Sequence, residues 1–137
     1  MRREKKALCV GMVVVCLFFA WSTLYGFNEK DVQTLKKTNK CPKCDLSGAK
    51  LNNLDLSNAD VSSANLSGAD LSNSTLYQGD LSNANLSGAN LSNANLSEVS
   101  LSGANVSKAN FNKTYLDQST WINGKRCKIG SVGQCKQ

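Results

Sequence analysis

Six cysteines are the residues of this 137-residue sequence with the clearest chemical potential, and four of them form two close pairs. Cys41 and Cys44 have two residues between them, and Cys127 and Cys135 lie near the C-terminus. Paired cysteines can hold zinc, take part in thiol–disulfide exchange or form structural disulfides. The sequence contains no histidine, so the commonest general base and metal ligand is missing.

The remaining polar residues do not suggest catalysis. We find no nucleophile beside a base, no cluster with metal-ligand spacing and no glycine-rich phosphate loop, so we expect a non-enzymatic protein without a cofactor or metal. The formal net charge is +6, but seven acids oppose three bases between Cys44 and Ser119. The basic residues therefore concentrate near the two ends, and the charge does not indicate nucleic-acid binding.

A repeat of five residues must position these side chains. From Leu46 to Leu116 one apolar residue returns at every fifth position, and a small residue, usually alanine, stands two positions before it. A period of five fits neither a helix nor a strand. It fits a chain that turns a corner every five residues, so that four sides make a coil of twenty. The sixteen units from Cys44 to Trp121 make four coils, about 19 Å tall at the strand spacing of ~4.8 Å.

The motif Ala-(Asp/Asn)-Leu-Ser-(Asn/Gly) resembles that of the pentapeptide-repeat family and is nearly ideal at residues 64–68, 69–73, 84–88 and 89–93. The resemblance implies an all-β solenoid, a right-handed quadrilateral β-helix. Residues 36–46 and 121–135 look like the Cys-containing N- and C-terminal caps of exported members. We expect stacked leucines in the core, Asn and Ser bonded to the backbone of the corners, and Asn ladders between coils.

This architecture limits what the cysteines can do. Four coils separate the two pairs, whereas zinc needs every sulfur about 2.3 Å away, so a shared zinc site is excluded. In an oxidising compartment we expect a disulfide between Cys127 and Cys135 that closes the C-terminal cap. Cys41 and Cys44 should both point inward, either joined to each other or as small core thiols. A thiol-redox role of the Cys41/Cys44 pair is an alternative function.

The N-terminal residues predict export. A basic start is followed by an apolar run from Ala7 to Trp21, which is between the lengths typical of a signal peptide and of a membrane span. We predict a signal peptide or membrane anchor over residues 1–26, with membrane contact through residues 7–26 if it is not cleaved. The positive charge before the run places the rest of the chain outside the cytoplasm, in the periplasm or the extracellular space.

Three further segments complete the predicted organisation: residues 27–43, 44–121 and 122–137. The first is a linker with a short amphipathic capping helix, in which Asn28 and Asp31 resemble a capping box. A flexible membrane stalk is the alternative for this segment. The second is the β-helix, and the last is the C-terminal cap.

One side of the predicted coils departs from the repeat. Stepping by twenty residues brings together, on the side that carries Leu56, Leu76, Leu96 and Leu116, a candidate protein-binding face made of Tyr77, Gln78, Glu98, Tyr115, Asp117 and Gln118. We therefore predict a protein-binding or structural module of the cell envelope, with an unknown protein partner.

A DNA mimic that binds gyrase, as some pentapeptide-repeat proteins do, is the alternative function. It would need continuous rows of acids, but most rows here change to Asn halfway along the stack. The chain also ends in a Gly-containing Cys loop, whereas those proteins dimerise through a C-terminal helix.

Overall fold

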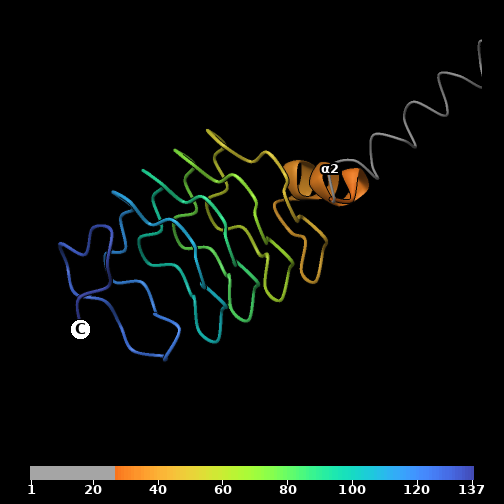
Figure 1. The fold of residues 1–137 in the computed structure, drawn as a ribbon. Coiled ribbons are helices and arrows are strands. Elements are labelled where there is room, and N and C mark those ends of the chain that lie inside the picture. Colours follow the sequence, from red (N-terminus) through yellow and green to blue (C-terminus); the bar gives the residue numbers. More distant parts are fainter. Residues whose placement is uncertain (1–26) are drawn as a thin grey trace, which may run out of the picture.

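The computed structural model describes residues 27–137. Helix α2 (Glu29–Thr38) lies at one end of a stack of coils, and the C-terminus lies at the other (Figure 1). Residues 1–26, which contain the predicted signal or anchor, lie outside the described residues. Within residues 27–137, no helix has the length and apolar character needed to cross a membrane.

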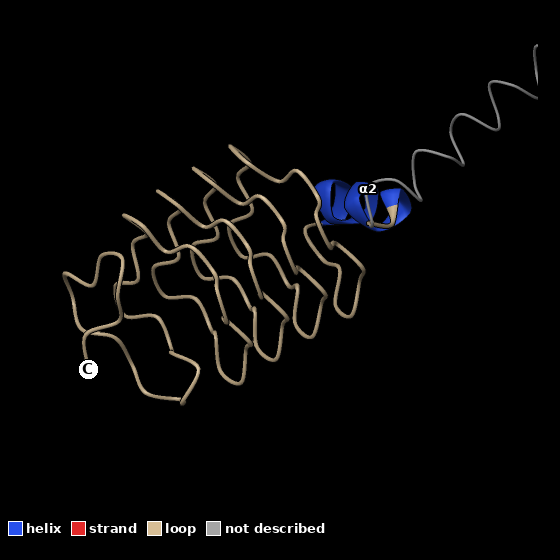
Figure 2. Cartoon of the chain, in the orientation of Figure 1, coloured by secondary structure: helices blue, strands red, loops and turns tan. Residues whose placement is uncertain are grey.

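Single-residue bridges hold the coils together, and the described chain is therefore drawn without strand arrows (Figure 2). The bridges are parallel and join residues twenty apart, from Lys40 with Asp60 to Ser100 with Thr120. The twenty-residue coil expected from the period of five is confirmed by this register.

Every corner between Leu46 and Ser119 is a β-turn that starts at the central apolar residue. In the first, the Ala49 N–H donates to the Leu46 carbonyl oxygen over 3.1 Å, and Gly48 has a φ of 69°. In a type II turn the third of the four residues has a positive φ and the second does not. This conformation favours Gly and Asn at the third position. Gly and Asn fill most of these positions, which explains the last residue of the repeat motif.

The core is a column of central leucines lined by small residues. Leu66, Leu86, Ala84 and Ala89 are at most 1% exposed. Val99, a bulky residue at a small position, is also fully buried.

Stacking explains how Val99 is accommodated. The Ser100 N–H donates to the Gly79 carbonyl oxygen over 3.0 Å, so Val99 lies one coil away from a residue without a side chain. The smallest of the residues at these small positions and one of the bulkiest are therefore neighbours in one column.

Helix α2 joins the first coil through its N-terminal residues. Asn28 caps the helix by accepting from the Lys30 N–H over 3.1 Å, and Val32 and Leu35 are buried. The predicted capping box is wrong in its second half, because the Asp31 carboxylate accepts from the Asp45 N–H over 2.9 Å. The Asn28 N–H instead donates to the Asp45 carbonyl oxygen over 3.0 Å. The Asp31 carboxylate and the Asn28 N–H therefore both connect helix α2 to the first coil.

The C-terminal residues fold back on the last coil. Val132 forms an antiparallel bridge with Tyr115, and Arg126 forms one with Thr120. The ring of Trp121 packs edge-on against Phe111, with 5.5 Å between the ring centroids. The polar backbone of the last coil is thus partly paired by the chain itself.

Candidate functional site

Most polar repeat residues build the corners. The carboxylate of Asp70 accepts from the Ser72 N–H over 3.1 Å and from the Ser72 hydroxyl over 2.7 Å. The hydroxyl bond is the main reason why the pKa of Asp70 lies below its usual value, although burial opposes the shift. Asn65 accepts from the Ser67 N–H in the same way. The expected bonding to corner backbone is confirmed for Asn65, and for Ser74, whose hydroxyl donates to the Leu71 carbonyl oxygen over 2.6 Å, whereas the Ser72 hydroxyl bonds to a side chain.

One face carries a ladder of amides, and we call residues 45–48, 65–68, 85–88 and 105–108 the ladder face. The Asn85 amide donates to the Asn65 side-chain oxygen, and the Asn105 amide donates to that of Asn85, each over 3.3 Å. Asn65 in turn donates to Asp45 over 3.2 Å. The predicted Asn ladder is confirmed, and its side chains are occupied with one another.

The opposite face differs, and we call residues 55–58, 75–78, 95–98 and 115–118 the tyrosine face. The Tyr77 hydroxyl donates to Oε1 of Glu98 over 3.0 Å, and the Gln78 amide donates to Oε2 over 2.9 Å. Both bonds run from one coil to the next. The carboxylate is exposed, and its pKa is below the usual value because of the bonds from Gln78 and Tyr77 and the charge of Arg126. Glu98 in turn raises the pKa of Tyr77, because it accepts the hydrogen bond from the Tyr77 hydroxyl.

The long polar side chains of the tyrosine face occupy turn positions that disfavour them. Gln78, Glu98 and Gln118 have φ values of 58°, 60° and 56°. On the ladder face the same turn position holds Gly48, Gly68, Gly88 and Lys108. A left-handed conformation costs a residue with a β-carbon roughly 1–2 kcal/mol. The tyrosine face therefore carries three such costs in consecutive coils, without the glycines that relieve them on the ladder face.

The structure separates the six predicted face residues into groups. Tyr77, Gln78 and Glu98 form one hydrogen-bonded group, whereas Tyr115 is 51% exposed beside the C-terminal cap. Gln118 occupies the turn position one coil beyond Glu98.

Asp117 uses one of its carboxylate oxygens to hold the C-terminal cap. It accepts from the Gly130 and Ser131 N–H groups over 2.8 and 2.9 Å, so it fixes the cap.

The sequence did not indicate that Arg126 acts on this face. Its charge contributes to the lowered pKa of Glu98. Arg126 reaches this part of the molecule because the C-terminal segment turns back and pairs with Thr120. No repeat period extends into that segment, so counting along the sequence does not predict that Arg126 pairs with Thr120.

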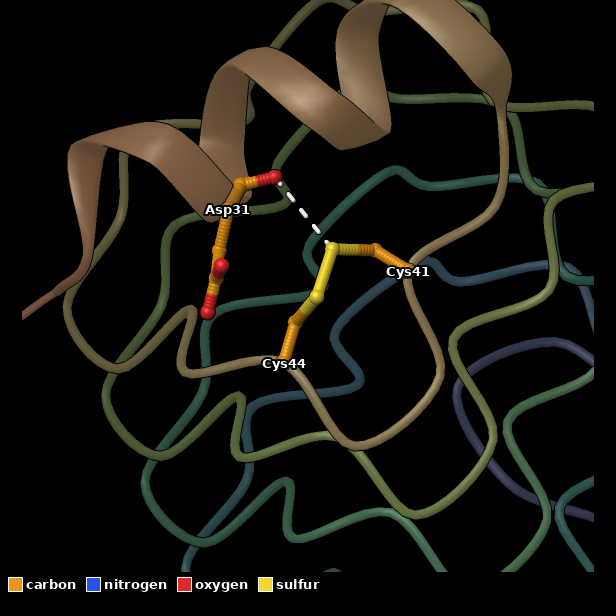
Figure 3. Close-up of side chains that lie close together, drawn as sticks. All are labelled: Asp31, Cys41 and Cys44. Carbon is orange, nitrogen blue, oxygen red and sulfur yellow. Dashed lines mark hydrogen bonds between the residues drawn. A yellow bond between two sulfur atoms is a disulfide. The ribbon is translucent and has the colours of Figure 1, made fainter.

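Both cysteine pairs outside residues 1–26 are disulfides in the structure. Cys41 and Cys44 are joined with Cα atoms 5.4 Å apart, and Cys127 and Cys135 with Cα atoms 5.1 Å apart. Sγ of Cys41 is buried under α2, 3.3 Å from the Asp31 carbonyl oxygen (Figure 3). Asp31, Cys41 and Cys44 have ligand atoms close enough to share a metal ion. In the disulfide, however, neither sulfur is the thiolate that binds metals.

Comparison with known proteins agrees with the repeat. The family model for pentapeptide repeats matches residues 43–78 and 80–118 in eight copies. The sequence matches no curated protein at a significant level.

Solved structures of pentapeptide-repeat proteins are also similar. One from the Arabidopsis thaliana thylakoid lumen is 28% identical with a TM-score of 0.51, over 53% of this chain and 50% of that one. One from Nostoc PCC 7120 is 29% identical with a TM-score of 0.37, over 64% of this chain and 78% of that one. The chain thus spans about half the length of the Arabidopsis protein. The repeats form the right-handed β-helix solenoid that such proteins share.

Proposed function

Because the chain belongs to the pentapeptide-repeat family, we propose that it is a non-enzymatic binding module of the cell envelope. Its binding surface is the tyrosine face, and its partner is a protein. The two caps close the quadrilateral solenoid, with α2 covering the first coil, so that the molecule acts as a rigid support for that surface.

One observation carries the proposal: Tyr77, Gln78 and Glu98 form a connected, solvent-facing group at corners where the repeat elsewhere has mostly Ser, Asn and Gly. Gln78 and Glu98 occupy left-handed turn positions, which makes them unfavourable for stability alone. Tyrosine surrounded by polar groups is typical of protein-recognition surfaces. A binding role gives these side chains a purpose that the fold does not require.

Export of the repeats is the second part of the proposal. The basic and apolar N-terminal sequence supports it, and so do the two disulfides, which persist in oxidising compartments. The Arabidopsis relative comes from the thylakoid lumen. We include membrane anchoring through residues 7–26 as the form that the uncleaved chain takes. Cell fractionation tests this part, and an intact chain found soluble in the cytoplasm would contradict it.

An affinity pull-down from envelope extracts tests the binding surface. We expect the wild-type chain to retain a protein that the Tyr77→Ala/Tyr115→Ala variant releases. Ser107→Ala/Lys108→Ala changes two exposed residues of the ladder face and is the matched control, which should retain the partner. Equal retention by all three proteins would remove the tyrosine face from the proposal.

The two alternative functions have less support. On the ladder face, Asn follows the single Asp45 in every later coil, so this face does not carry the continuous acids of a DNA mimic. A redox role requires Cys41 and Cys44 to cycle while Cys127 and Cys135 stay oxidised. Counting free thiols under graded reduction distinguishes this role from two purely structural disulfides.

A further inference from the structure

We infer that the tyrosine face recognises an arginine side chain on an exposed segment of the partner protein, with Glu98 as its anionic contact. This inference rests on the proposed function and adds the chemical class of the partner. It follows from the charge of the face, the arrangement of its hydrogen bonds and the position of Arg126.

The tyrosine face carries a net negative charge. It contains three acids, Asp55, Glu98 and Asp117, and no lysine or arginine. The ladder face has one acid and one base, Asp45 and Lys108. Asp55 is bonded within its own corner by the Ser57 N–H and hydroxyl, and Asp117 is bonded to the C-terminal cap. Glu98 is the acid whose carboxylate is held by side chains of the tyrosine face itself, so we take it as the group that attracts a partner. A cationic segment complements this surface, and an acidic one is repelled.

The geometry around Glu98 suits a guanidinium group. Tyr77 and Gln78 each donate to one of its two oxygens and so hold the carboxylate in place. Each carboxylate oxygen can accept a further hydrogen bond. The planar fork of arginine binds the two oxygens of a carboxylate together, whereas the ammonium of lysine is a point charge. The aromatic ring of Tyr77, whose hydroxyl contacts the same carboxylate, offers a neighbouring surface for a cation.

The bridge between Thr120 and Arg126 brings one guanidinium of the chain back onto the last coil, which is paired with the coil of Glu98. Arg126 acts on Glu98 through its charge, although no ion pair joins them in the part of the chain that the structure describes. An incoming arginine therefore enters a site whose potential is partly reduced by Arg126. Removing the Arg126 charge should therefore strengthen binding of the incoming arginine. If Arg126 instead helped to hold Glu98 in its binding position, removing it would weaken binding.

Fluorescence anisotropy with a synthetic peptide tests the inference. The probe is fluorescein-labelled Gly-Arg-Gly-Arg-Gly-Arg, with Lys and Glu versions as comparators, added to the full chain in neutral detergent. We expect the Arg peptide to bind several-fold more tightly than the Lys peptide, and the Glu peptide not to bind. Glu98→Gln should weaken binding of the Arg peptide about tenfold, because an exposed charge-assisted contact is lost. Arg126→Gln should strengthen it about twofold to threefold.

Asp80→Asn is the matched control. It removes one negative charge from another face, and Asn can accept the Ser82 N–H bond that Asp80 accepts, as Asn85 does for Ser87. We expect it to leave the affinity for the Arg peptide unchanged within about twofold, apart from long-range screening effects.

Five outcomes would overturn the inference. Equal weakening by Glu98→Gln and Asp80→Asn, or equal affinity for the Arg and Lys peptides, would show attraction by overall charge alone. Self-association that Glu98→Gln abolishes, without binding of the Arg peptide, would identify a second copy of the chain as the occupant. If no peptide binds while the pull-down still retains a partner through Tyr77 and Tyr115, the partner chemistry is wrong and the binding function stands. If the pull-down also shows no difference, both proposals fail.

Discussion

The ladder face and the tyrosine face share one backbone but use their side chains in opposite ways. On the ladder face, Asn65, Asn85 and Asn105 bond to one another and to the corner backbone, and glycine fills most of the left-handed turn positions. On the tyrosine face, the central amide column is replaced by Asp55, Thr75, Asn95 and Tyr115. Its left-handed positions hold Gln and Glu from the second coil on.

This difference shows that the fold leaves the outer side chains free within limits. Both faces turn a central apolar residue, nearly always leucine, toward the core and keep the register of twenty residues, so these features fix the solenoid. The outer residues then either add stability or present groups to solvent. We expect substitutions on the ladder face to lower stability and leave binding unchanged. We expect substitutions on the tyrosine face to weaken binding without lowering stability.

Breaking the amide ladder should have the largest effect. The Asn85 side chain donates to Asn65 and accepts from Asn105 and from the Ser87 N–H. Since a hydrogen bond contributes about 0.5–1.5 kcal/mol, Asn85→Ala should lower the free energy of unfolding by roughly 2–3 kcal/mol. Urea unfolding monitored by circular dichroism measures this loss.

Thr75 gives the matched control for the ladder prediction. It occupies the same position before the central leucine on the tyrosine face, and its bridges with Asp55 and Asn95 use the backbone. Thr75→Ala should change the free energy of unfolding by less than about 0.5 kcal/mol. Similar losses for the two variants would mean that the ladder contributes little and that the contrast between the faces is wrong.

The left-handed turn positions give the second prediction. Gly88 has a φ of 68°, and a β-carbon added there would meet no atom within 4 Å. The cost of Gly88→Gln is therefore conformational and should be roughly 1–2 kcal/mol. Gly88→Asn is the control, because Asn tolerates this conformation better, and it should cost clearly less. Equal costs would show that the strain argument does not hold at these corners.

The solenoid was largely predictable from the sequence, whereas the candidate site was predictable only in part. The period of five gives the register directly, because each residue has the same environment as the one twenty positions away. It therefore also brought Tyr77 and Glu98 to one face. It did not reveal that Asp117 is used by Gly130 and Ser131.

The differences occur where the repeat ends. The C-terminal cap follows a path of its own, and antiparallel bridges bring Arg126 and Val132 back onto the last coil. At the other end, the Asp31 carboxylate bonds to Asp45 in the first coil, although its spacing from Asn28 suggested a capping box. At the N-terminal end a tertiary contact replaces the local capping pattern, and at the C-terminal end no repeat is present to predict one.

A trade between stability and binding gives the third prediction. Glu98→Asn replaces a strained turn residue with one that tolerates the left-handed conformation. The two bonds that it loses are exposed, so the free energy of unfolding should rise by roughly 0.5–1 kcal/mol. The same variant should lose the partner protein in the pull-down. A variant that is less stable than wild type would mean that the group around Glu98 supports the fold, and this would remove the main argument for a binding role.

The dependence of stability on pH should show the smallest effect and should separate corners held by a carboxylate from corners held by an amide. The pKa of Asp70 is lowered mainly by the bond from the Ser72 hydroxyl, and that of Glu98 mainly by the bonds from Gln78 and Tyr77. A carboxyl group whose pKa is lower in the folded state stabilises the protein above its unfolded pKa. This stability is lost as the pH falls through the folded pKa.

The amides of the ladder do not titrate, so the loss below about pH 4 should come from the carboxylates. Urea midpoints measured from pH 7 to pH 2.5 should therefore fall less for Asp70→Asn than for the wild-type chain, because Asn90 shows that Asn accepts the corresponding Ser92 N–H bond. An equal fall in both proteins would exclude Asp70 as a source of the acid sensitivity.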